Sequence, residues 1–201
     1  MQNVYPLVAT LAAYLIGSVS FAVVVSRAMG LKDPRTYGSH NPGATNVLRS
    51  GNRVAAVVTL VLDALKGFVP VLLVQVRGDR FGLGEGTVAL VALAAFLGHL
   101  WPLFFRFQGG KGVATAAGIV FGLSWQLGLA LLVVWVLIAI AFRISSLASI
   151  VAAIVTPPLG FYFLGNWPEA WVLIPITLLL LWRHRANIRK LVAGTESKIG
   201  A

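Results

Sequence analysis

The sequence predicts an all-α integral membrane protein, a polytopic bundle of seven transmembrane helices of which some are short. The 201-residue chain is 58% hydrophobic and only 11% charged, whereas soluble domains carry about 25% charged residues. Long apolar runs recur along the whole chain, which excludes a soluble domain with one anchor. The alternation of apolar and polar residues that a membrane β-barrel requires is absent.

Seven apolar segments define the expected spans. They cover residues 4–25, 54–76, 86–105, 113–124, 125–142, 147–164 and 171–182. The fourth is too short to cross a bilayer alone at about 1.5 Å per residue. A re-entrant hairpin over residues 113–135, which leaves five full spans, is therefore the alternative. No basic segment precedes the first span and no convincing cleavage site follows it, so we expect it to be retained. We expect one domain over residues 1–201, without internal repeats.

The basic residues are unevenly distributed. The formal net charge is +10, and 13 of the 16 Lys and Arg residues would lie on one side, in the connections after the first, third and fifth spans and in the tail. Positive loops stay in the cytoplasm, so we expect the N-terminus outside and the C-terminus inside. Membrane topology then accounts for most of the charge, and no nucleic-acid partner is expected. The chain has no cysteine, which excludes disulfides, thioester intermediates and thiolate metal sites.

The longest polar interruption, residues 39–49, lies between the first two spans. Asn41-Pro42-Gly43 has turn chemistry, with Gly43 able to adopt positive φ, and a following polar residue, Thr45 or Asn46, could cap the next helix. A capped turn is one interpretation. A phosphate site is the other, because small polar donors are gathered beside an arginine fork. The candidate phosphate ligands are Ser39, Asn41, Thr45, Asn46 and Arg49.

A glycine-rich loop precedes the fourth span. Gly109, Gly110 and Gly112 surround Lys111, which would let the backbone approach a phosphate closely, with a helix N-terminus behind it. The spacing is not that of a Walker A loop. A flexible cytoplasmic turn is the alternative interpretation.

The basic tail begins at residue 183. On a continuing helix His184 and Asn187 share a face, and Glu196 follows further on. A collar of snorkelling arginines explains the charge, but it does not explain the pairing of His184 with Asn187.

Ionisable residues also occur inside two expected spans. Asp63 and Lys66 lie three residues apart on one helix face, and such groups inside a membrane are either functional or paired. We favour a structural ion pair. His99, near the end of the third span, is either a structural interface residue or a catalytic one, and the structural role is favoured.

Together these segments resemble the three motifs of the bacterial acyl-phosphate:glycerol-3-phosphate acyltransferases, the PlsY family. The resemblance rests on Ser39 to Asn46 with Arg49, on the loop from Gly109 to Thr115, and on the tail residues His184, Asn187, Gly194 and Glu196. It extends over essentially the whole chain in length, motif order and spacing. One departure is His40, which stands where the family more often has glycine.

The resemblance implies transfer of a fatty acyl group from a long-chain acyl phosphate to glycerol 3-phosphate, giving lysophosphatidic acid and phosphate. This is the first acylation of phospholipid synthesis. It carries over Ser39, His184 and Asn187 as catalytic residues, Ser39, Arg49 and the glycine loop as phosphate ligands, and Glu196 as a residue needed for integrity. It further implies a single acyltransferase domain in the bacterial cytoplasmic membrane with its site on the cytoplasmic side. The acyl-phosphate-producing enzyme and membrane lipids are the expected partners.

The chemistry of the residues agrees with this implication. Both substrates bear phosphates, and the donor is already activated, so positioning and charge stabilisation suffice. None of the three histidines is followed five residues later by Asp, and no carboxylate cluster suggests a metal. We therefore expect no cofactor, no metal and no acyl-enzyme, with the proton of the glycerol hydroxyl passing to His184 or to a substrate phosphate oxygen. A transporter of an anion or organic phosphate is the main alternative, and a structural membrane subunit is a third.

Overall fold

The computed structural model describes residues 4–199, and within them every regular element is a helix. Eleven α-helices and two short 3-10 helices follow one another. The α-helices are α1 (Val4–Gly17), α2 (Phe21–Ala28), α3 (Ala44–Leu48), α4 (Arg53–Arg77), α5 (Glu85–Leu100), α6 (Val113–Leu123), α7 (Trp125–Phe142), α8 (Ser145–Leu164), α9 (Pro168–Trp171), α10 (Leu173–Arg183) and α11 (Arg185–Val192). The 3-10 helices are η1 (Gly78–Phe81), after α4, and η2 (Leu103–Phe105), after α5.

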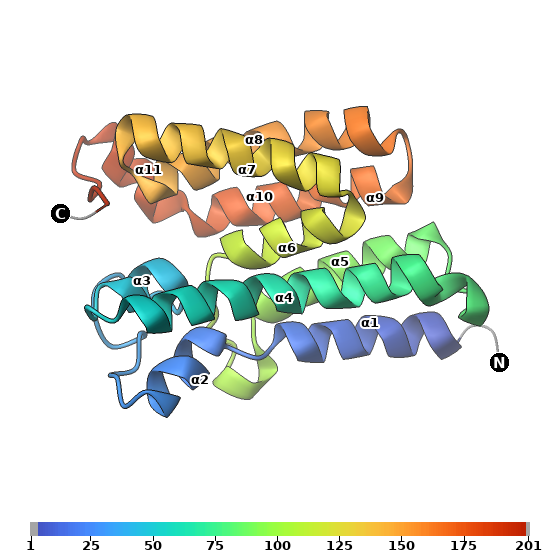
Figure 1. The fold of residues 1–201 in the computed structure, drawn as a ribbon, viewed down its shortest axis with the longest axis horizontal. Coiled ribbons are helices and arrows are strands. Elements are labelled where there is room, and N and C mark those ends of the chain that lie inside the picture. Colours follow the sequence, from blue (N-terminus) through green and yellow to red (C-terminus); the bar gives the residue numbers. More distant parts are fainter. Residues whose placement is uncertain (1–3, 200–201) are drawn as a thin grey trace.

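The long helices lie side by side along one axis, as Figure 1 shows. One end of the bundle holds α2, α3, the start of α4, the α7–α8 connection and α11, whereas α1 begins at the other end, near the α4–α5 connection (Figure 1). The uneven charge along the sequence is therefore an uneven charge between the two ends of the molecule. The N-terminus itself, residues 1–3, lies outside the described residues.

All seven expected segments are helical, but seven full spans are not confirmed. Four segments are long and apolar enough to cross a membrane: Arg53–Phe81, Glu85–Phe105, Trp125–Phe142 and Ser145–Leu164. A fifth results if α1 and α2, which are bent by 44° at their junction, count as one span. α6 and α10 have 11 residues each, or about 16 Å at 1.5 Å per residue.

Residues 113–135 form two helices that are joined by a turn at Ser124, which lies inside the segment of the alternative hairpin. The second helix, α7, runs unbroken from Trp125 to Phe142 and so extends past residue 135. α6 ends at Leu123, and the side-chain oxygen of Ser124 accepts a hydrogen bond from the backbone N–H of Leu127 (3.3 Å) and so caps α7. The turn between α6 and α7 lies short of the end where α4 meets α5 (Figure 1).

Glycines let the central helices approach closely. A methyl group on Gly118 of α6 would meet the backbone oxygen of Ala64 on α4, and one on Gly67 of α4 would meet the backbone of Thr115. In the same way, a methyl group on Gly17 of α1 would meet the backbone of Ala95 on α5. Small residues at helix contacts are the usual means of packing in a membrane, where the hydrophobic effect does not drive helices together.

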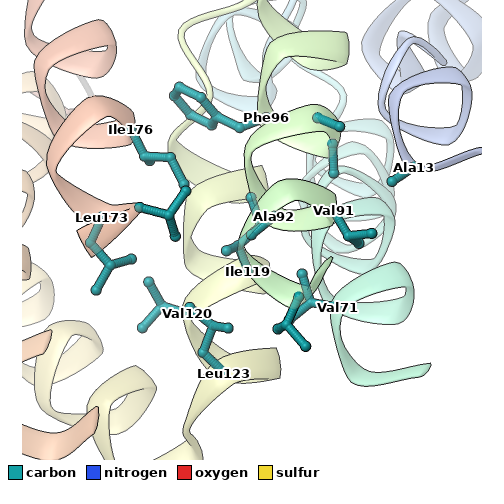
Figure 2. Close-up of a cluster of buried hydrophobic side chains, with 14 of the residues drawn as sticks. Ala13, Val71, Val91, Ala92, Phe96, Ile119, Val120, Leu123, Leu173 and Ile176 are labelled. Atoms are coloured by element: carbon teal, nitrogen blue, oxygen red, sulfur yellow. The ribbon is translucent and has the colours of Figure 1, made fainter. Parts of the chain in front are cut away.

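The main apolar core lies inside the bundle of helices. Figure 2 shows side chains of α1, α4, α5, α6 and α10 meeting there, and Phe96, Ile119 and Leu173 are fully buried. The short helix α6 stands in this core, with α4 on one side and α7 on the other. The N-terminus of α6 therefore lies inside the molecule. The glycine loop, which directly precedes α6, accordingly lies at the site described next.

Candidate active site

A cavity of about 520 Å³ brings the three sequence segments together. Most of the expected site residues line it, from the loop before α4, the loop before α6, and the end of the chain. They are Ser39, Asn41, Thr45, Asn46, Arg49, Lys111, Gly112, His184, Asn187 and Glu196, with Asp63 at the wall. Gly109, Gly110 and Lys66 are not among the lining residues.

Asn46 organises the first loop. Its side chain is buried (1% exposed), and its amide nitrogen donates to the carbonyl oxygens of Pro34 (2.6 Å) and Tyr37 (3.1 Å). Its amide oxygen accepts from the backbone N–H of Ser39 (3.0 Å). Because both functions of this amide are used within the loop, Asn46 shapes the site and is not free to hold a phosphate, contrary to the expectation from sequence.

The donors that remain available belong to exposed residues of the same loop. Within residues 4–199 the side chains of Ser39 and Thr45 make no hydrogen bond, and Arg49 makes one, from Nη2 to Ser197 Oγ (3.0 Å). These side chains border the cavity. They can therefore turn to an anion without breaking a buried interaction.

The backbone of this loop differs from the sequence-based expectation. Gly43 is extended, with φ −153°, and the cap of α4 is Asn52, whose side chain accepts from Ala55 N at 2.9 Å. Positive φ occurs instead at Gly38 (59°) and His40 (54°). Only a few non-glycine residue types tolerate this region, histidine among them. A left-handed backbone thus explains why glycine would suit the place of His40.

All three glycines of the second loop lie close against α5. A methyl on Gly109 would meet the carbonyl oxygens of His99 and Leu100, and one on Gly110 would meet the His99 ring. Of the three glycines, only Gly112 has positive φ (89°). An alanine at Gly110 would thus push the loop away from α5, and any loss of phosphate binding would follow from that displacement.

Hydrogen bonds join the second loop to the tail. Lys111 Nζ donates to Asn187 Oδ1 (2.5 Å), and Asn187 Nδ2 donates to Glu196 Oε1 (2.7 Å). Ser146 on α8 donates to the same carboxylate oxygen at 2.8 Å. Glu196 therefore fixes Asn187, and Asn187 fixes the lysine. The structural role of Glu196 stays a prediction.

Lys111 is a cation that water reaches poorly. Burial lowers its pKa to about 8, because the charged form is disfavoured away from water. The carboxylate of Glu196 opposes this shift, and the charges of Arg49, Arg183 and Lys190 add to it. A phosphate in the cavity would therefore meet an ammonium group that lacks a full counter-charge.

His184 is held as a neutral imidazole. It is 2% exposed, and its Nδ1 lies 2.8 Å from the carbonyl oxygen of Leu180, so that nitrogen carries the proton. Burial lowers the pKa of His184 to about 4. Its Nε2 is then an acceptor at neutral pH. Since His184 lines the cavity, this is the ring nitrogen available to take a proton from a bound hydroxyl.

The intramembrane pair is present where sequence predicted it. Lys66 Nζ lies 2.7 Å from Asp63 Oδ1 and donates to the carbonyl oxygen of Val19 (2.7 Å). His99 Nδ1 is 3.8 Å from the same carboxylate oxygen. These buried groups connect α4 with α5 and with the α1–α2 bend, and Asp63 and His99 also line the cavity. A structural ion pair stays our interpretation.

An apolar cavity of about 220 Å³ adjoins the polar one. It lies among α4, α6, α7, α8 and α10. Both cavities share the lining residues Leu60, Val113, Ala114, Trp135 and Ser149. At the junction Trp135 Nε1 donates to Ser149 Oγ (3.0 Å). The polar site thus continues into an apolar groove.

Comparison with known proteins identifies the family. The model of the family described as "Glycerol-3-phosphate acyltransferase" matches residues 7–194. The chain belongs to this family. A glycerol-3-phosphate acyltransferase of Burkholderia pseudomallei (strain 1710b) is 60% identical over 197 residues, covering 96% of this chain and 95% of the relative. One of Albidiferax ferrireducens is 56% identical over 208 residues, covering 100% and 92%.

A solved structure of this acyltransferase family has the same fold. The crystal structure of PlsY (YgiH), described as an integral membrane glycerol 3-phosphate acyltransferase in its glycerol 3-phosphate form, superimposes with a TM-score of 0.88 at 39% identity, covering 98% of this chain and 96% of that one. A second structure of that protein, described as its lysophosphatidic acid form, gives a TM-score of 0.86. This chain is thus a multi-pass integral membrane protein, and none of these relatives supports the transporter alternative.

Some residues of the candidate site were not expected from the sequence. Trp135 and Ser149 come from α7 and α8, where they stand in apolar runs without a distinctive pattern. Their only sequence signal is polarity or an indole inside an expected span. The role of Arg183 was also missed, because snorkelling explained its charge.

Proposed function

We propose that this protein transfers a fatty acyl group from an acyl phosphate to glycerol 3-phosphate, giving lysophosphatidic acid and inorganic phosphate. One observation carries the proposal beyond family membership. A donor-rich cavity with a poorly hydrated lysine continues into an apolar groove through shared wall residues. Phosphates fit the first part and an acyl chain fits the second. The reaction is the first acylation of phospholipid synthesis.

The chain's own groups divide the work in this proposal. Lys111, Arg49 and the side chains of Ser39, Asn41 and Thr45 hold the phosphates, and the acyl chain lies in the apolar groove among α4, α6, α7, α8 and α10. The glycerol hydroxyl oxygen attacks the acyl carbonyl carbon, an ester bond forms, and the bond from that carbon to the phosphate oxygen breaks. The hydroxyl proton goes to Nε2 of His184 or to the departing phosphate. Asn187 keeps Lys111 in place during these steps.

No acyl-enzyme is part of this mechanism. A serine nucleophile needs a base held against it, yet within residues 4–199 the Ser39 hydroxyl makes no hydrogen bond to a histidine. The acceptor already supplies a hydroxyl, so a detour through serine gains little when the donor is activated. Ser39 instead donates a hydrogen bond to a phosphate or to the developing oxyanion.

The membrane orientation belongs to the same proposal. The site lies at the end of the bundle that holds α3 and α11, where the basic connections gather (Figure 1). The positive-inside rule assigns this end to the cytoplasm. We infer a bacterial cytoplasmic membrane protein, with its seven apolar segments forming one acyltransferase domain and with an acyl-phosphate-producing enzyme as the partner that supplies the donor.

The test is product formation by purified protein in detergent. Given a long-chain acyl phosphate and glycerol 3-phosphate, it should form lysophosphatidic acid, measured by mass spectrometry. Acyl coenzyme A and acyl carrier protein should not replace the donor, because nothing in the described residues resembles a nucleotide site or a carrier-protein site. Efficient turnover with acyl coenzyme A alone would contradict the assignment of the donor.

A further inference from the structure

We propose that Arg183 is a positioning residue that orients the glycine loop, so that the backbone N–H of Lys111 joins its ammonium group in holding a substrate phosphate. The inference rests on the function proposed above and adds a residue to its phosphate site. Arg183 is half-buried at the end of α10 and does not line the cavity. It acts, therefore, through the loop that it contacts.

The guanidinium of Arg183 donates hydrogen bonds to two successive carbonyl oxygens of that loop. Its Nε donates to the oxygen of Gly110 (2.9 Å), and its Nη2 donates to the oxygen of Gly109 (2.5 Å). Hydrogen bonds with a charged donor are about twice as strong as neutral ones, and the fork fixes their direction. Two carbonyls are thus turned toward Arg183.

The planarity of the peptide bond determines what lies on the other side. In a trans peptide the C=O and the following N–H point in opposite directions, and no cis peptide occurs among the described residues. For the Gly109–Gly110 peptide, the opposite N–H donates to the carbonyl oxygen of His99 (3.2 Å). This peptide unit is therefore held on both sides.

The next peptide unit, from Gly110 to Lys111, is held on one side only. Its carbonyl is bound by Arg183, whereas the N–H of Lys111 has no hydrogen-bond partner within residues 4–199. Lys111 itself lines the cavity. That N–H points away from Arg183 and, because Lys111 lines the cavity, it is left for a ligand there, where a phosphate oxygen would satisfy it.

Arg185 provides a matched control. It lies on the other side of His184 and, like Arg183, stacks on Trp182, with its guanidinium carbon 4.5 Å from the ring centroid against 5.9 Å for Arg183. Its one hydrogen bond goes to the carbonyl oxygen of Trp182 (3.2 Å), and its side chain is exposed. Replacing it removes the same charge without releasing the loop.

The experiment compares KM and kcat for both phosphate substrates in R183A, R183K and R185A. R183A should raise the KM of the substrate held by the loop about tenfold or more, the effect of losing a hydrogen bond to a charged group, with a smaller change in kcat. R183K keeps the positive charge but not the bidentate guanidinium. The KM of this variant should therefore stay at least threefold above that of the wild type. R185A should stay within about twofold. Methylguanidine should partly restore R183A.

A second readout does not depend on turnover. Inorganic phosphate should raise the melting temperature of the wild-type protein in detergent, at matched ionic strength, more than that of R183A or R183K. If the wild type forms no product, the proposed function fails, and the melting comparison alone decides the role of Arg183. If the wild type turns over and R183K matches it in KM and in phosphate response, charge suffices and the inference is wrong. Should R183A not fold, R183K decides.

Discussion

At the scale of single residues, the site depends on which groups are charged when substrate arrives. Lys111 loses its charge at a lower pH than an ordinary lysine, since burial lowers its pKa to about 8. His184, with a pKa lowered to about 4, is already neutral. The phosphates themselves are almost fully ionised above pH 7, because their second pKa is about 6. Above neutral pH, Lys111 is thus the group whose titration should be seen.

We therefore predict that kcat/KM for the phosphate substrate falls above pH about 8. The lysine must be protonated to attract phosphate, and a base with a lowered pKa loses its proton at a lower pH than usual. Initial rates between pH 6 and 10 would show the fall. Lys111→Arg should move it to higher pH, because guanidinium stays charged throughout this range. A flat profile up to pH 10 in the wild type would show that the charge of Lys111 is not needed.

A second residue-scale prediction concerns Ser39. If it donates one hydrogen bond to a phosphate or oxyanion, Ser39→Ala should lower activity by ~10²–10³-fold. No acylated protein should accumulate when acyl phosphate is supplied without glycerol 3-phosphate. Intact-protein mass spectrometry measures this directly. A stable acyl group on Ser39 would show that the serine is a covalent nucleophile, although the pair of substrates would stand.

At the scale of the elements, the site depends on how closely α6 lies against α4. Gly118 and Gly67 permit that approach, and α6 carries the glycine loop at its N-terminus. The two helices are in contact through their backbones rather than through large buried side chains, which is common for membrane helices. Moving α6 outward would move the phosphate loop with it.

We predict that Gly118→Ala lowers both the stability and the activity of the protein. The added methyl would meet the backbone oxygen of Ala64, and such overpacking costs about 1–3 kcal/mol. In a chain of this size that lowers the melting temperature by about 2–10 °C, measured by thermal unfolding in detergent. Gly86→Ala is the control, because a methyl on this α5 glycine meets nothing within 4 Å. Equal losses in both variants would contradict the close-contact explanation.

At the scale of the whole molecule, charge and topology act together. The substrates are anionic, and a strongly basic face raises their local concentration as well as fixing the orientation of the chain. In the orientation proposed above, the net charge of +10 would serve both insertion and substrate capture. The same face holds the loops of the candidate site.

The expected topology follows from this arrangement. A reporter fused at the C-terminus should respond as cytoplasmic, and one inserted in residues 77–85 should respond as external. Paired reporter fusions, such as an enzyme active only outside and a fluorescent protein active only inside, give the readout. A cytoplasmic signal from the α4–α5 connection would reverse the orientation and place the site on the wrong side for a cytoplasmic acyl phosphate.

The sequence by itself determined the class of protein, the helical segments, the three site segments and the buried pair Asp63–Lys66. Each of these leaves a local signal: apolar runs, gathered small polar residues, glycines around a lysine, or a charge inside a span. The order and spacing of the motifs further indicated the family.

Only the tertiary structure decided what the individual groups do. Asn46 and Arg183 looked like ligand or surface residues, yet their partners are backbone carbonyls at Pro34, Tyr37, Gly109 and Gly110. No local sequence pattern shows which backbone carbonyl oxygens a side chain from a distant segment, such as Arg183, will bind. The bend between α1 and α2 and the groove beside Trp135 likewise depend on how helices pack. Packing is a property of contacts between segments, and a hydropathy pattern records only the length and polarity of each segment alone.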